Sequence, residues 1–150
     1  WLMDIQANDP KVYPKNTPVV AAVATGEIDV GFVNHYYLYR FLAEEGESFA
    51  ARNYRPRTEG PGSLMMVAGA GILATSKNFD AAEKFLEFML SKIGQAYFVN
   101  ETYEYPLIDG VKTQRLLAPP SQINIPQIDM ADLADLRGTQ KLLREMEVLP

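Results

Sequence analysis

The sequence has no cysteine and a single histidine, His35, among its 150 residues. The lack of cysteine excludes a zinc–thiolate site, an iron–sulfur cluster and a thiol nucleophile. One histidine is too few for the two-histidine, one-carboxylate site of non-haem iron enzymes. The sequence also lacks a nucleophile elbow and the glycine spacing of Walker and dinucleotide-binding loops. These absences argue against the common metalloenzyme, hydrolase and nucleotide-binding classes.

Positive charge is also scarce, because 14 Lys and Arg residues face 19 Asp and Glu residues and leave a net charge of −5. This balance argues against a nucleic-acid surface. The one basic cluster, Arg52, Arg55 and Arg57, lies in a Pro- and Gly-rich segment and is expected to be solvated. No apolar run reaches the roughly 18 residues of a membrane span, and no signal peptide is present. The chain opens at Trp1 in mid-domain sequence, so we expect a mature fragment.

Helix and strand patterns alternate in the first third of the chain. Thr17 and Pro18 are typical of an N-cap and a first helical position, and they predict a short helix that ends at Gly26. The apolar, β-branched run 28–33 predicts a buried strand. A second helix is expected from Tyr36 to near residue 46. Helix, strand and helix with short joints indicate an α/β fold.

The remainder of the chain is expected to mix extended segments with helices. The apolar run 63–75 contains two glycines and predicts bent strand segments. The clearest helix covers 78–91 and has one apolar face. Ser91 is expected to cap a further short helix. Two short helices are predicted on either side of Gly138, near 130–137 and 139–147.

The junction between the predicted strand 28–33 and the next helix is the candidate site. Ligands of open α/β sheets bind beyond the carboxyl ends of strands, and helix N-termini there favour anions. Asn34 lies at this junction and Asn16 lies just before the preceding helix, so both side chains could donate to an anion. A simple helix cap is the alternative role for each asparagine.

Tyr36 and Tyr37 follow directly, about 100° apart around the helix axis, so both hydroxyls could reach one point. A phenol has a pKa near 10, but a trivalent cation displaces its proton at neutral pH. Arg40, one turn beyond Tyr36, would favour the phenolate. Ferric iron suits such ligands, whereas calcium and magnesium call for carboxylates and carbonyls. Carbonate or phosphate could supply the remaining coordination.

The residues alone leave another interpretation open for this pair. Tyrosine makes up 8 of the 150 residues, so an adjacent pair arises easily. On pattern alone, aromatic packing with satisfied hydroxyls is favoured over metal binding. His35 could ligate beside the pair, although a lone histidine is more often a surface or capping residue. Tyr103 and Tyr105 are interpreted as structural, with Glu104 a solvated neighbour.

Four stretches resemble the periplasmic ferric-iron-binding proteins of bacterial ABC importers. The segment GEIDVG at 26–31, followed by NHYY at 34–37, looks like the segment that carries the iron-binding tyrosine pair of that family. Three further stretches agree with the family in order and spacing: YPKNT at 13–17, VAGAGIL at 67–73 with NFDAA at 78–82, and YEYPL at 103–107. The resemblance spans nearly the whole chain.

The resemblance implies the carboxyl-terminal half of a two-lobed, type II periplasmic-binding-protein fold. Residues 1–66 and 118–150 would belong to the second lobe, and residues 67–117 would cross into the first. The amino-terminal half of the family fold, with its other ligands and main anion-binding loop, would be absent. We therefore expect the piece to self-associate through tight or domain-swapped contacts.

The resemblance also implies a non-catalytic role. Tyr36 and Tyr37 would be phenolate ligands of Fe³⁺, and Asn16 and Asn34 would hold a synergistic carbonate or phosphate. The partner would be a membrane permease, and the location periplasmic or extracytoplasmic, with a lipid anchor as one option. Three alternatives remain: transport of another solute such as a phosphonate or polyamine, a tyrosinate iron enzyme, and an interaction domain with structural tyrosines.

Overall fold

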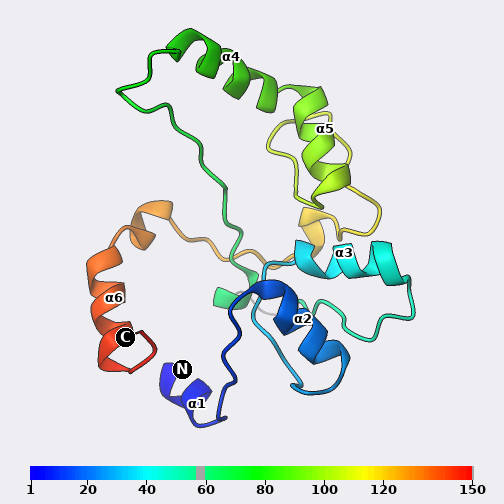
Figure 1. Cartoon of the computed structure of the whole chain (residues 1–150), viewed down its shortest axis with the longest axis vertical. Helices are drawn as coiled ribbons and strands as arrows, with labels where there is room; N and C mark the ends of the chain where they lie inside the picture. The colour runs from blue at the N-terminus through cyan, green and yellow to red at the C-terminus, as the bar shows by residue number, and fades with distance from the viewer. Residues whose placement is uncertain (57–59, 150) are drawn as a thin grey trace.

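The chain folds into helices that are joined by long extended segments (Figure 1). The computed structural model describes residues 1–56 and 60–149. The α-helices are α1 (Leu2–Gln6), α2 (Asn16–Ala24), α3 (Tyr36–Glu45), α4 (Phe79–Met89), α5 (Lys92–Glu101) and α6 (Leu136–Glu145). Three 3₁₀ turns are η1 (Pro61–Ser63), η2 (Pro120–Gln122) and η3 (Met130–Leu133). The part of the chain that is described contains no helix long and apolar enough to cross a membrane.

Helices α2 and α3 pack on each other and end where the sequence predicts. Gly26 follows α2 with φ +74°, and Gly46 follows α3 with φ +81°. This left-handed conformation ends a helix at little cost only when the residue is glycine. The start of α2 differs from the prediction. Lys15, not Thr17, is the N-cap, and no side chain caps the helix.

The core lies between α2, α3 and the segment that follows α3. Its buried members are Val20, Leu38, Phe49 and Ala51. The Phe41 ring stacks on Phe49 with centroids 4.7 Å apart and planes at 7°. Burial of a side chain such as Leu38 stabilises the fold by about 1.5–3 kcal/mol. The core therefore fixes α3, the helix that carries the tyrosine pair.

The strands predicted over 28–33 and 63–75 do not form, and residues 1–56 and 60–149 contain no strand. Both segments run extended, but a strand also needs a neighbour to complete its ladder of hydrogen bonds, and none lies beside them. Val30 and Phe32 are accordingly 74% and 69% exposed instead of buried. An apolar, β-branched run predicts an extended backbone but not the presence of a partner. The α/β class is thus not confirmed.

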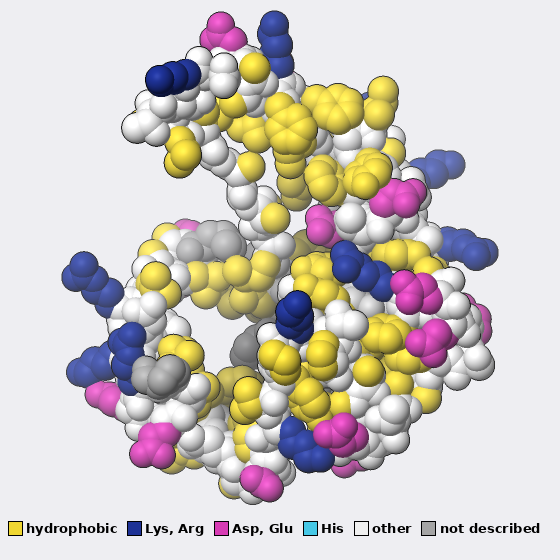
Figure 2. Space-filling view, in the orientation of Figure 1, with side chains coloured by type: hydrophobic (Ala, Val, Ile, Leu, Met, Phe, Trp, Pro, Cys, Tyr) yellow, Lys and Arg dark blue, Asp and Glu magenta, His cyan; other side chains and the backbone are white. Residues whose placement is uncertain are grey.

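Helices α4 and α5 form an arm that projects away from α2 and α3 (Figure 1). Ser91 caps α5 as predicted, since its hydroxyl accepts from the N–H of Gly94 at 3.1 Å. The apolar face of α4 is present but uncovered, because no residue of α4 is buried and Phe85 is 61% exposed. Figure 2 shows hydrophobic side chains gathered over this arm.

The molecule exposes far more surface than its mass requires. Its accessible surface is 11813 Å². A compact monomer of 16.8 kDa is expected to expose about 7,600 Å². The extended segments and the uncovered apolar face of α4 both expose surface that a compact monomer would bury.

The chain closes with two short helical elements, η3 and α6, as predicted, but the break between them lies at residues 134–135. Gly138, the predicted point of separation, lies within α6. The Asp135 carboxylate accepts from the N–H of Gly138 at 2.8 Å and caps the helix. A Cβ at Gly138 would overlap that carboxylate. Glycine therefore makes room for the cap instead of breaking the helix.

Candidate ligand site at the start of helix α3

The tyrosine pair forms the first turn of α3. Tyr36 and Tyr37 are its first two residues, and the N–H of Tyr37 donates to the carbonyl of Asn34 at 3.2 Å. The two rings are in contact, with centroids 4.8 Å apart and planes tilted by 37°. Two phenols thus lie side by side on a helix that the core holds in place.

Asn34 contacts one member of the pair directly. Its side-chain N–H donates to the hydroxyl oxygen of Tyr36 at 3.0 Å. The contact therefore fixes the position of the Tyr36 hydroxyl, and it links two of the residues selected from the sequence.

Arg40 lies on the other tyrosine. Its guanidinium carbon is 5.6 Å from the centroid of the Tyr37 ring, within the range of a cation–π contact. Tyr37 also packs against the core, whereas Tyr36 faces a hollow. The two tyrosines therefore differ in their surroundings: an amide beside Tyr36, and a cation and apolar side chains beside Tyr37.

Asn16 is the first residue of α2 and is half-buried. It caps no helix, because Lys15 is the N-cap. It is also not among the residues that line the hollow beside Asn34 and Tyr36. The structure brings together Asn34, Tyr36 and Tyr37, with Arg40 beyond them, but gives no contact that joins Asn16 to them.

The hollow beside Tyr36 has a volume of about 510 Å³. Its wall mixes apolar side chains with polar groups from distant parts of the chain, among them Asn34, Tyr36, Arg55, Ser63 and Glu104. Ser63 is buried, and its hydroxyl has no hydrogen-bond partner among the described residues. Sequence reasoning missed Ser63 and Glu104 here, because only the return of the chain past α3 brings them to this wall.

His35 connects the start of α3 to two other segments of the chain. Its Nε2 lies 2.8 Å from the carbonyl oxygen of Tyr103, and its own carbonyl accepts from the Asn53 amide at 2.9 Å. Its ring contacts Tyr36 and Tyr105 at centroid distances of 5.5 and 5.4 Å. Burial lowers the pKa of His35, chiefly because the charged ring would lose solvation. A neutral His35 thus joins α3 to the 103–105 segment, and its Nε2 is already engaged.

Tyr103 and Tyr105 have packing contacts of their own. The Tyr103 ring stacks on Tyr39 at 5.3 Å. The Tyr105 hydroxyl donates to the carbonyl of Ala118 at 2.8 Å, and burial raises its pKa. Arg55 in turn donates to the Tyr39 hydroxyl at 3.2 Å. These contacts agree with the structural interpretation of both tyrosines.

The basic cluster is engaged with the fold instead of merely solvated. The guanidinium of Arg52 donates to three backbone carbonyls, those of Glu47, Phe49 and Ala51. Arg57 lies outside the described residues. Arg52 thus closes the turn after α3, a role that composition alone does not predict.

A metal site of carboxylates and imidazoles is not available in the described part of the chain. No group of three or more His, Cys, Asp or Glu side chains converges there. Metal binding at this position would depend on the phenol oxygens of Tyr36 and Tyr37, which are hard donors once deprotonated.

Comparison with known proteins identifies the family of this chain. A profile of the bacterial extracellular solute-binding proteins matches residues 2–96, more than half of the chain, which therefore belongs to this family. The resemblance drawn from the sequence is confirmed at this level.

Several proteins that this chain resembles have names that describe them as iron-binding. The chain is 34% identical over 146 residues to the major ferric iron-binding protein of Neisseria meningitidis, covering 97% of this chain and 44% of that one. It is 31% identical over 135 residues to the Fe(3+)-binding periplasmic protein of Serratia marcescens, covering 89% and 40%. It matches the crystal structure of iron-bound HitA from Pseudomonas aeruginosa with a TM-score of 0.88 and 32% identity, covering 97% and 47%. The chain thus spans less than half the length of these relatives.

Proposed function

We propose that this chain is part of a solute-binding protein that captures ferric iron outside the cytoplasm and delivers it to an ABC permease. The contact between the Tyr36 and Tyr37 rings at the start of α3 is the observation that carries this proposal. Fe³⁺ displaces phenol protons at neutral pH, so two adjacent phenols suit it. The names of the relatives support the same cargo. Such a protein binds and releases its cargo without converting it.

The proposed roles follow the surroundings of each residue. Tyr36 and Tyr37 supply the oxygen ligands, and the Asn34 amide positions the hydroxyl of Tyr36. Arg40, whose guanidinium lies over the Tyr37 ring, supports this ligand. A synergistic carbonate or phosphate would accept from the Asn34 amide and would be favoured by the positive end of the α3 dipole. Asn16, at the start of the neighbouring α2, is the second proposed donor to this anion.

The proposal extends to the layout of the chain. Residues 1–66 and 118–150 would form one lobe, and residues 67–117 would belong to the other. The projection of α4 and α5 away from α2 and α3 supports this division (Figure 1). The iron site would then lie on the first of these parts, at the edge that faces the second.

Self-association is proposed for the chain taken alone, with a second copy as the partner. The exposed surface exceeds the expectation for a compact monomer by about 4,000 Å². Permanent interfaces bury about 2,000–5,000 Å² in total. The apolar face of α4, with Phe85 and Phe88 exposed, is the proposed centre of this contact.

Ferric affinity measured by competition with citrate tests the proposed site. The double variant Tyr36→Phe/Tyr37→Phe is expected to lose more than about 100-fold, beyond the 10–100-fold typical of residues that only support a ligand. Asn34→Ala is expected to lose about tenfold, because it removes such a support. Tyr97→Phe on α5 is the control and should keep the parent affinity. Equal affinity in the double variant and the control would refute the assignment.

A further inference from the structure

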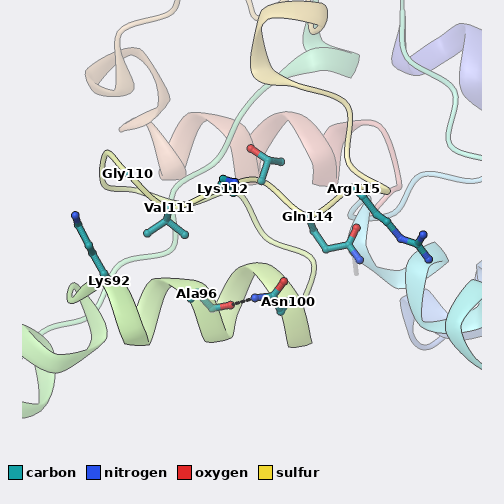
Figure 3. A pocket seen from close by; sticks show the side chains of 9 residues that line it. Lys92, Ala96, Asn100, Gly110, Val111, Lys112, Gln114 and Arg115 are labelled. Atoms are coloured by element: carbon teal, nitrogen blue, oxygen red, sulfur yellow. Dashed lines mark hydrogen bonds between the residues drawn. The ribbon is translucent and has the colours of Figure 1, made fainter.

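A second hollow, of about 450 Å³, lies between α5 and the loop that follows it (Figure 3). One wall is a single face of α5, where Lys92, Ala96 and Asn100 follow at intervals of four residues. The other wall is the 110–115 loop. This hollow shares no lining residue with the one beside Tyr36. It is therefore a separate feature of the arm.

The wall of this hollow is positively charged although the chain as a whole is acidic. Lys92, Lys112 and Arg115 line it, and no acidic residue does. Among residues 1–56 and 60–149, none of these three cations is in an ion pair. Glu101 and Asp109, each next in sequence to a lining residue, are not part of the wall. Three cationic residues thus line the hollow with no acidic residue among them, which creates a local positive potential. Figure 3 shows Lys92 and Arg115 at its two ends.

The polar side chains of the loop add hydrogen-bond donors to this charge. The side-chain oxygen of Gln114 accepts from the backbone N–H of Leu116, which leaves the side-chain NH₂ group of Gln114 to donate. Thr113 adds a hydroxyl to the wall. On the opposite wall the Asn100 amide donates to the carbonyl of Ala96 at 2.8 Å.

The turn at Gly110 lies close to the Lys92 ammonium group. Gly110 has φ +79°, and a Cβ there would stand 3.3 Å from the Lys92 ammonium nitrogen. Glycine therefore permits both the left-handed turn and the close approach of Lys92. In Figure 3 the Lys92 side chain extends from α5 toward this turn. The loop and the helix thus hold a positive charge at the end of the hollow.

We infer that this hollow binds a phosphate group with at least two negative charges, carried by a free small molecule or by a lipid headgroup. A phosphate offers several oxygen acceptors at once, which matches the amide, hydroxyl and cationic donors of the wall. Lysine binds phosphate as a point charge and arginine binds it through two parallel hydrogen bonds. The volume is within the range of small-molecule sites. This inference is independent of the iron site.

Calorimetric titration of the full chain with pyrophosphate at low salt tests the inference. The double variant Lys112→Gln/Arg115→Gln is expected to weaken binding at least about tenfold, since two charge-assisted hydrogen bonds are lost. Lys77→Gln/Lys84→Gln removes the same charge from exposed positions at α4 and is expected to stay within about twofold of the parent. The iron-site variant Tyr36→Phe/Tyr37→Phe should bind pyrophosphate as the parent does.

Co-sedimentation with vesicles separates the two sources of phosphate. Binding to phosphatidic acid but not to phosphatidylcholine vesicles, lost in Lys112→Gln/Arg115→Gln, would assign the hollow to lipid headgroups. Pyrophosphate binding without vesicle binding would assign it to free phosphate compounds. Two results would overturn the inference: no binding in either assay, or equal weakening in both double variants, which would reduce the effect to net charge. Circular dichroism of each variant checks that the fold is retained.

Discussion

Helices α3 and α4 are both amphipathic, yet the apolar face of α3 is buried and that of α4 is exposed. The apolar stripe of α3 meets Phe49 and Ala51, and Leu38 is only 3% exposed. The apolar face of α4 meets no such partner, and its phenylalanines face solvent. Periodicity therefore specifies which face of a helix is apolar, whereas burial depends on what the rest of the chain supplies. The tyrosine pair lies on the helix that is anchored.

The largest difference between the two regions should appear in stability. Leu38→Ala is expected to lower the free energy of unfolding by about 2–5 kcal/mol, because it leaves a cavity in the core. Phe85→Ala on α4 is expected to change the stability of the monomer by no more than about 0.5 kcal/mol. Urea unfolding of dilute protein measures both. Equal losses would mean that the α4 face is buried in solution and would break the comparison.

The uncovered arm should instead govern association. Phe85→Ser/Phe88→Ser is expected to raise the dissociation constant of the self-associated chain at least about tenfold, since apolar residues at the centre of an interface carry most of its energy. Sedimentation velocity over a range of concentrations gives this constant. Tyr54→Ser, exposed and outside the arm, is the control. A parent that stays monomeric throughout, or a double variant that associates like the parent, would exclude the α4 face as the contact.

Two glycines extend the comparison to the backbone. Gly46, with φ +81°, ends α3, and Gly46→Ala is expected to cost about 1–2 kcal/mol because alanine is strained in that conformation. Gly69 lies in the extended segment that leads to α4, with open space around it and no positive φ. Gly69→Ala is expected to be neutral or to stabilise by about 0.4–1 kcal/mol. Thermal unfolding of both variants checks this order, and a costly Gly69→Ala would contradict it.

The smallest effect concerns a surface contact between the segments that precede and follow α2. The Tyr13 hydroxyl donates to the Glu27 carboxylate at 2.8 Å. This bond, with help from Lys11, lowers the pKa of Glu27. Its contribution to stability is therefore present above the ordinary pKa of the carboxyl and is lost as the pH falls through the lowered value. Tyr13→Phe should raise the pKa of Glu27, as followed by NMR titration, and an unchanged value would show that the bond is not formed in solution.

Local signals in the sequence predicted much of the helical framework. Gly26 and Gly46 end α2 and α3, and Ser91 caps α5, because each acts on its own few residues. The strand predicted over 28–33 failed since its pairing depends on distant backbone. The break predicted at Gly138 was wrong for a different reason. The Asp135 carboxylate caps α6 and has room to do so only because Gly138 has no Cβ, and the presence of a glycine does not by itself indicate such a contact.

The candidate site was predictable only in part. Asn34, Tyr36 and Tyr37 are adjacent in sequence, so their contact in the first turn of α3 follows from helical geometry. The sequence placed Arg40 within reach of Tyr36, but packing lays its guanidinium over Tyr37. Ser63 and Glu104 reach the hollow beside Tyr36 only through the path of the folded chain. Neighbours along the chain were thus accessible to sequence reasoning, whereas neighbours in space were not.

The visible absorption spectrum of the ferric protein tests the central claim most directly. Phenolate bound to Fe³⁺ gives a charge-transfer band, so the parent chain and Tyr97→Phe are expected to show it when ferric iron is added with carbonate or phosphate. Tyr36→Phe/Tyr37→Phe is expected to show none. The absence of a band in the parent, or a band of equal strength in the double variant, would contradict the assignment of Tyr36 and Tyr37 as the iron ligands.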